Sequence, residues 1–132
     1  MAGRAILVTN NPTFLSRVPA GVEVLVLDGG ARDALTAARD RVHRGWRLAN
    51  HPLYGNFRPH QQPYRSLLLL PPVASGATDS ESLHFLEEAL QLYQCPASKI
   101  RRSLPGDLPD AMRRDCALLD RELLKATLES LH

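Results

Sequence analysis

Residues 5–12 are AILVTNNP, a short apolar run that ends in two asparagines and a proline. An unbroken apolar run of this length is typical of a strand buried on both faces, as in a parallel sheet. Asn11 can cap a helical turn that has Pro12 at its first position, so we expect one short turn over residues 13–17. The start of the chain therefore predicts a buried strand followed by a tight turn.

Two more strands are predicted at residues 22–27 (VEVLVL) and 66–70 (SLLLL), with a brief extended piece at residues 47–49. Their apolar residues suit a buried sheet, and turn residues follow each of them. The second strand is closed by Asp28-Gly29-Gly30 and the later one by Pro71-Pro72.

Three helices are predicted from apolar residues at three- and four-residue spacing. They cover residues 31–44, residues 78–93, and a long C-terminal segment from residue 107 or 110 to about 131. Gly45 follows the first helix as a C-terminal cap. Thr78 and Glu81 match a capping box at the start of the second helix.

This order of elements indicates a single α/β domain over residues 1–132 with a mostly parallel sheet. Right-handed crossovers favour a small, doubly wound, three-layer sandwich of three or four strands, with helices on both faces. In such a sheet, ligands bind beyond the carboxyl ends of the strands. We therefore expect Asn10-Asn11, Asp28-Gly29-Gly30 and Pro71-Pro72 to lie at one edge.

The C-terminal helix carries two apolar stripes. The first is predicted to pack on the sheet and consists of Met112, Cys116, Leu119, Leu123 and Ala126. The second can pack on the preceding helix or meet another subunit, and it consists of Ala117, Leu124, Leu128 and Leu131. We expect a homodimer.

Composition excludes several classes of protein. The formal net charge of +2 is too small to indicate nucleic acid or a membrane surface as partner. Cys95 and Cys116 form no disulfide framework, which is typical of a reducing cytoplasm. The apolar run at residues 67–73 contains two prolines and is far shorter than the roughly 20 residues that span a bilayer. We therefore expect a cytoplasmic protein without a membrane segment.

Residues 45–66 (GWRLANHPLYGNFRPHQQPYRS) form an unusually long connection that is rich in aromatic residues and proline. Between Arg39 and Arg65, six arginines stand against one acid, Asp40. Arginine recognises carboxylates and phosphates through paired N–H donors, so this segment predicts an anion site or an acidic partner. The alternative is that Trp46, Leu53 and Phe57 fold the loop onto the sheet and the arginines are solvated. The predicted ligand-binding residues are Asn10, Asn11, His51, Tyr54, Arg58, Tyr64, Arg65 and Ser66.

Other chemistry has weaker support. His43, His51 and His60 match no compact metal-ligand spacing. The chain has no Gly-x-Ser-x-Gly elbow, and Asp28-Gly29-Gly30 lacks a full dinucleotide fingerprint. We therefore assign no catalytic residue, and we predict no metal site and no cofactor.

Several segments of the first 70 residues resemble the GrdX family. They are Thr9-Asn10-Asn11-Pro12, Arg39 to Gly45, His51-Pro52-Leu53-Tyr54-Gly55-Asn56 and Pro63-Tyr64-Arg65-Ser66. This family is associated with gene clusters that encode the glycine, sarcosine and betaine reductases. The resemblance implies an accessory role with a reductase-complex protein as partner, and it supplies no catalytic residues.

The sequence thus predicts a non-catalytic accessory or binding protein. One alternative is a small enzyme or a sensor of a small anion that uses residues 51–66 and Asn10-Asn11 as one cleft. A second alternative is a nucleic-acid-binding module, in which arginines alternate with Trp46, Tyr54, Phe57 and Tyr64. The nearly neutral charge and the lack of an RNA-binding signature argue against this second alternative.

Overall fold

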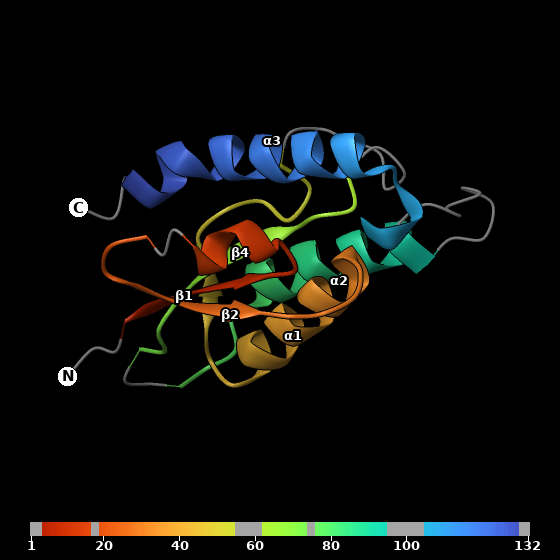
Figure 1. The fold of residues 1–132 in the computed structure, drawn as a ribbon. Helices are drawn as coiled ribbons and strands as arrows, with labels where there is room; N and C mark the ends of the chain where they lie inside the picture. The colour runs from red at the N-terminus through yellow and green to blue at the C-terminus, as the bar shows by residue number, and fades with distance from the viewer. Residues whose placement is uncertain (1–3, 17–18, 55–61, 74–75, 95–104, 130–132) are drawn as a thin grey trace.

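The computed structural model describes residues 4–16, 19–54, 62–73, 76–94 and 105–129. A four-stranded sheet lies between helices that cover both of its faces (Figure 1). The strands are β1 (Ala5–Thr9), β2 (Val22–Val26), β3 (Arg47–Leu48) and β4 (Ser66–Leu70). The α-helices are α1 (Ala31–His43), α2 (Ser80–Gln94) and α3 (Asp110–Glu129), and two short 3-10 turns are η1 (Pro12–Leu15) and η4 (Pro105–Asp107).

Local sequence signals set most of these boundaries. Asn11 caps η1, because its side-chain oxygen accepts the Thr13 N–H at 3.1 Å. Gly45, at a φ of 101°, ends α1 in a Schellman motif. In this motif the Gly45 N–H donates to the Val42 carbonyl at 3.0 Å and the Trp46 N–H donates to the Arg41 carbonyl at 3.1 Å.

The predicted capping box of α2 is wrong by one residue. The helix begins at Ser80, and the carboxylate of Asp79 accepts both the N–H and the hydroxyl of Ser82. Asp79 is therefore the N-cap in place of Thr78, since a carboxylate at this position accepts the open N–H groups of the first turn at least as well as a hydroxyl does.

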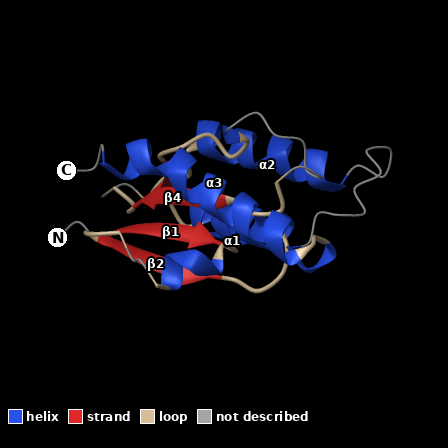
Figure 2. Cartoon of the chain, turned by 45° about the horizontal axis from the view of Figure 1, so that its top comes forward, coloured by secondary structure: helices blue, strands red, loops and turns tan. Residues whose placement is uncertain are grey.

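The prediction of a mostly parallel, doubly wound sheet is also wrong. The strand order is β2-β1-β4-β3, with one parallel pair, β1 and β2. β4 runs antiparallel to both β1 and β3, and the opposite directions of β1 and β4 are visible in Figure 2. An unbroken apolar run indicates that both faces of a strand are covered, and here that condition holds for an antiparallel strand as well. β4 is the strand that follows β3 in the chain, and it pairs directly with β3. Consecutive strands that pair in this way commonly run antiparallel.

The direction of β4 changes what lies at each edge of the sheet. Thr9, at the end of β1, pairs with Ser66, at the start of β4. Pro71-Pro72 therefore lies at the edge opposite to Asn10-Asn11, contrary to the prediction. The segment that enters β4, Tyr64-Arg65-Ser66, takes its place beside the asparagines.

Side chains alternate between two apolar layers, as the twofold periodicity of a strand requires. Ile6 and Val8 of β1, with Leu67 and Leu69 of β4, pack against α1 and α2. Leu7 and Leu68 face the other way and pack with Phe14 of η1 and Leu124 of α3. The protein is thus a three-layer arrangement in which α1 and α2 cover one face and η1 and α3 cover the other.

The two stripes of α3 have exchanged roles relative to the prediction. Ala117, Asp120 and Leu124 are buried against β4 and η1. The stripe that we expected on the sheet faces outward, with Met112 49%, Leu119 40% and Leu123 37% exposed. Asp120 lies in the inward stripe, and the sheet supplies the donors that its carboxylate needs.

Among the helices that the structure describes, none combines the length and the apolar character that a membrane span requires.

Candidate functional site

A cavity of about 610 Å³ opens at the carboxyl ends of the parallel pair β1 and β2. One side is formed by residues that directly follow these strands, and the facing side comes from the entry to β4, from η4 and from the start of α3. The residues that line it are Asn10, Pro12, Val26, Leu27, Asp28, Gly29, Tyr64, Pro105, Gly106 and Arg113. This location confirms that the segments after β1 and β2 meet at one edge of the sheet.

Asn10 fixes the floor of this cleft. Its Nδ2 donates to the carbonyl oxygens of Gly29 at 3.2 Å and Pro63 at 2.9 Å. Its Oδ1 accepts the Arg65 N–H at 2.9 Å. Gly29 has a φ of +106°, and a Cβ there would lie 2.3 Å from Oδ2 of Asp33, so only glycine fits this turn. One amide side chain thus ties together the segments that follow β1, follow β2 and precede β4.

Behind the floor lies a buried polar cluster centred on Asp120, which has no exposed surface. Its Oδ2 accepts the Ser66 hydroxyl at 2.6 Å and the Asn11 Nδ2 at 3.0 Å, and its Oδ1 accepts the Tyr54 hydroxyl. The Ser66 hydroxyl and Thr9 Oγ1 are 2.7 Å apart. Because Ser66 gives its proton to the carboxylate, Thr9 is the donor in that pair.

Burial has the largest effect on the pKa values of the acidic groups in this cluster. It raises the pKa of Asp120 above its ordinary value, and the hydrogen bonds from Ser66, Tyr54 and Asn11 oppose that rise in part. Burial also raises the pKa of Tyr54 well above its ordinary value, and the nearby Asp120 charge adds to the effect. The Tyr54 hydroxyl therefore keeps its proton and remains a donor to the carboxylate.

Arg65 supplies the opposite charge to Asp120 and is equally buried. Its Nε donates to the Tyr93 hydroxyl and its Nη1 to the Tyr54 carbonyl, both at 2.8 Å. The guanidinium carbon lies 5.1 Å from the Tyr54 ring centroid and 5.9 Å from that of Tyr93. Two aromatic faces and directed acceptors thus replace the water that a buried cation loses.

Tyr64 forms the link between the cluster and the cleft. Its backbone N–H donates to Gln62 Oε1 at 3.1 Å, and Gln62 Nε2 donates to the Cys116 carbonyl of α3 at 3.1 Å. Tyr64 lines the cavity, and its hydroxyl makes no hydrogen bond to another described residue. Burial raises the pKa of Tyr64, and the positive charge of Arg113 opposes the rise. Tyr64 therefore presents a protonated hydroxyl near a guanidinium.

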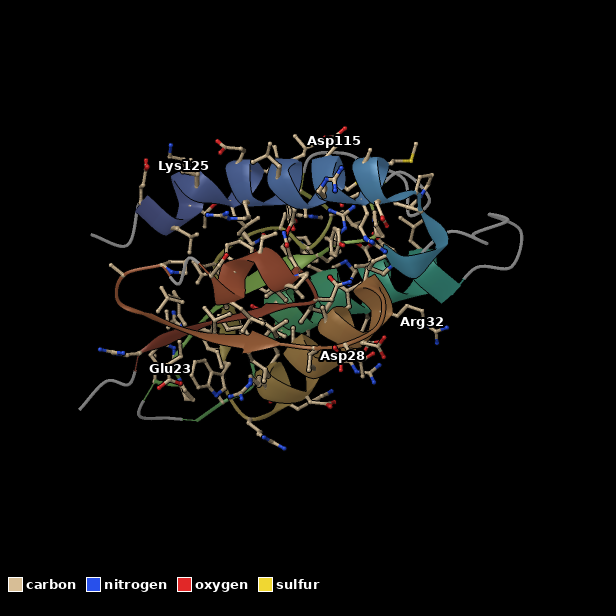
Figure 3. The ribbon with its side chains drawn as sticks, in the orientation of Figure 1. Glu23, Asp28, Arg32, Asp115 and Lys125 are labelled. Atoms are coloured by element: carbon tan, nitrogen blue, oxygen red, sulfur yellow. The ribbon has the colours of Figure 1, made fainter. Side chains whose placement is uncertain are left out.

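The two charged side chains of the cleft come from different elements. Arg113 lies in the first turn of α3 and forms an exposed ion pair with Asp110. Asp28 follows β2 and is exposed. Figure 3 shows Asp28 where β2 ends and α1 begins, and Asp115 and Lys125 on the outer side of α3.

The structure brings together most of the residues that the sequence predicted as a site. Asn10, Asn11, Tyr54, Arg65 and Ser66 share the hydrogen-bond network described above. Their polar atoms are engaged by one another and by neighbours such as Asp120 and Tyr93, whereas Tyr64, a further predicted residue, lines the cleft. Trp46 and Leu53 pack against the core beside α1 and α2, as the alternative interpretation of the loop expected.

One predicted residue, His51, lies elsewhere, and the position of a second is not described. His51 is exposed, its Nδ1 accepts the Leu53 N–H at 3.0 Å, and its ring lies 4.9 Å from that of Phe85. It borders a separate hollow of about 220 Å³ near the start of α2. Arg58 lies outside the described residues. Within the described part of the chain, no three His, Cys, Asp or Glu side chains gather as a metal ion would require.

Sequence reasoning placed Asp28 at the ligand-binding edge without naming it as a site residue, and it missed Asp120, Thr9, Tyr93 and Arg113. A signal for Asp120 was present, because an acid stands between Ala117 and Leu124 on a helical stripe that is otherwise apolar. An acid at such a position is buried only if donors meet it. Arg113 carried no comparable signal, since its place in the cleft depends on how α3 is docked.

The fold and the site define an α/β protein with a cavity at the carboxyl ends of a parallel strand pair. No curated protein and no solved structure matches the chain significantly. The family model described as GrdX-like protein matches residues 6–129. The chain therefore belongs to the GrdX-like family, and the match extends well beyond the first 70 residues that carried the resemblance.

Proposed function

We propose that this GrdX-like protein is a non-catalytic accessory protein that binds a small molecule with an anionic group in the cleft between β1, β2 and α3. The observation that carries this proposal is the pairing of Tyr64 and Arg113 in one cavity of about 610 Å³. Ligand pockets in proteins commonly enclose roughly 300–1,000 Å³, with mostly apolar walls and few polar groups. Val26, Leu27 and Pro105 supply such walls.

Arg113 suits an anion because its ion pair with Asp110 is weak. Asp110 engages one guanidinium nitrogen and its side chain is 76% exposed, so water screens the pair. A carboxylate or phosphate inside the cavity would meet the remaining N–H donors in a drier setting, where charge-assisted hydrogen bonds are stronger. The Tyr64 hydroxyl would add a neutral donor beside them.

A binding role fits the cluster behind the cleft better than catalysis does. Ser66 and Asp120 resemble parts of a catalytic pair, yet both are fully buried. The hydroxyl and the carboxylate bond to each other, and their remaining contacts are with Thr9, Asn11 and Tyr54. A nucleophile needs an open path to its substrate. We therefore assign this cluster the task of holding the walls of the cleft in position.

The family resemblance extends the proposal to partners and location. We propose that the protein acts in the cytoplasm beside a protein of the reductase systems. The cleft would then either sense a metabolite or deliver it to that partner.

The test is calorimetric titration with inorganic phosphate and with short monocarboxylates. We expect binding that Arg113→Gln weakens by about tenfold or more, as the loss of a charge-assisted contact requires. Tyr64→Phe should weaken binding less. Lys125→Gln removes a base from the outer side of α3 and serves as the matched control. Binding that is equal in Arg113→Gln and in Lys125→Gln would refute an anion site in this cleft.

A further inference from the structure

We propose that the ligand of this cleft is a zwitterion, with a carboxylate held by Arg113 and Tyr64 and a cationic amine held by Asp28. The inference rests on the proposed function, because it specifies the second charge of the molecule that the cleft binds. It is carried by the fact that one cavity is lined by one described acid and one described base from different elements.

Asp28 has no partner of its own in the described structure. It is exposed, and it forms no hydrogen bond or ion pair with another described residue. The neighbouring acid Asp33 differs, because its Oδ2 accepts the Gly30 N–H at 2.9 Å within the first turn of α1. Asp33 therefore already accepts an N–H group at the start of α1, and Asp28 lines the cavity without such a contact.

A ligand with only a negative charge is a poor match for this lining. Asp28 would repel an anion that entered to reach Arg113, because like charges that share one cavity repel each other. A cationic amine on the same ligand turns the repulsion into attraction. The molecule then has no net charge, and each of its charged groups meets a side chain of opposite charge in the cavity.

The backbone of the turn that carries Asp28 is held in a fixed position. Gly29 cannot be replaced without strain, and its carbonyl accepts the Asn10 amide from the cleft floor. The turn that carries Asp28 is thus fixed on the same side chain that fixes the entry to β4. Asp28 and Tyr64 are consequently held on one frame through Asn10.

The experiment uses unbranched ω-amino acids as rulers of the charge separation. Glycine, β-alanine, 4-aminobutyrate and 5-aminopentanoate are titrated into the full-length protein, each beside the carboxylic acid of equal carbon number. We expect one member of the series to bind about tenfold or more tightly than its matched acid, as an added charge-assisted contact would give. Asp28→Asn should abolish that difference without weakening the matched acid, and Arg113→Gln should weaken both.

The control for Asp28 is Glu23, an exposed acid at the opposite end of the same strand (Figure 3). Glu23→Gln should leave the preference for the amino acid intact. Equal binding of each amino acid and its matched acid overturns the zwitterion proposal while the anion cleft stands. Absence of binding by both series, with phosphate also silent, overturns the two proposals together. Asp28 and Glu23 both lie on the surface. Circular dichroism can therefore confirm that the Asp28→Asn and Glu23→Gln proteins are folded before they are titrated.

Discussion

Ser66 and Asp120 lie 54 positions apart in the chain, and the Ser66 hydroxyl donates to the Asp120 carboxylate at 2.6 Å in the middle of the protein. This contact joins the first residue of β4 to the inward face of α3. The same carboxylate accepts the Tyr54 hydroxyl, and the Tyr54 carbonyl accepts Nη1 of Arg65, so one acid connects α3, β4 and the segment that carries Tyr54. The packing of α3 on the sheet is therefore partly polar.

Replacing Asp120 with alanine should destabilise the protein by about 3 kcal/mol or more. The change leaves the Ser66, Tyr54 and Asn11 donors without their acceptor and leaves Arg65 without its buried counter-charge. Urea unfolding followed by circular dichroism measures the loss. Asp115→Ala removes an exposed acid of the same helix and should change the free energy of unfolding by less than about 0.5 kcal/mol. Equal losses in the two variants would show that the cluster contributes little.

The stability of the protein should depend on pH through Asp120. Burial raises its pKa in the folded state above the ordinary 3.8, so the folded state holds this proton more tightly than the unfolded state does. The contribution of Asp120 is then largest below that ordinary value and falls as pH rises through the raised folded value. Asp120→Asn cannot titrate at this position. We therefore expect the difference in unfolding free energy between wild type and Asp120→Asn to decrease as the pH rises from about 4 towards neutrality. An increase over that range would mean that Arg65 and the hydrogen bonds outweigh burial.

The three tyrosines of the chain should ionise late. Burial raises the pKa of Tyr54, Tyr64 and Tyr93 above the ordinary 10.0 in the folded protein. Each of them stabilises the fold below that ordinary value, and this contribution is lost as the pH rises through the folded value. Ultraviolet absorbance of tyrosinate should therefore appear at higher pH in the native protein than in protein unfolded in urea. Superimposable titrations of the two states would contradict the buried environment of these hydroxyls.

Association of two copies is expected through the outward stripe of α3. The sequence assigned a possible subunit contact to the stripe of Ala117 and Leu124, which packs inside the protein instead. Met112, Leu119 and Leu123 form an exposed apolar row, and a homodimer through this row would bury it. Sedimentation equilibrium at micromolar concentration should give the mass of two chains, and Leu119→Glu should reduce it to one. Leu118→Glu changes an exposed leucine on another side of the helix and should leave the dimer intact. A wild-type mass of one chain would make the dimer prediction wrong.

Local signals in the sequence predicted where elements begin and end. The bounds of β1 and β4 were predicted to the residue, and Asn11 and Gly45 cap the elements that they were expected to cap. Such boundaries depend on neighbours within a few positions, so a single sequence carries the information.

The direction of β4 and the rotation of α3 could not be read in the same way. A strand that is apolar on both faces has the same pattern in a parallel and in an antiparallel sheet. The two stripes of α3 are both apolar, and what distinguishes them is the match of Asp120 to donors on Ser66, Tyr54 and Asn11. That match links distant positions, and no local pattern reports it.

One consequence of the wrong strand direction is informative. In the predicted parallel sheet, Ser66 would have started β4 at the edge opposite to Asn10 and Asn11, and the proposed site would have been divided. The antiparallel direction is what places Tyr64, Arg65 and Ser66 beside the asparagines. The grouping of these site residues depends on a feature of the fold that the sequence did not predict.

The position of Asp120 near the end of the chain bears on how the protein matures on the ribosome. The donors on Asn11, Tyr54 and Ser66 and the charge on Arg65 are synthesised long before their shared acceptor. Synthesis proceeds from the N-terminus, so the sheet and its polar side chains leave the ribosome before α3 does. Until α3 docks, these donors lack their acceptor. Docking of α3 then supplies the Asp120 carboxylate and one wall of the cleft.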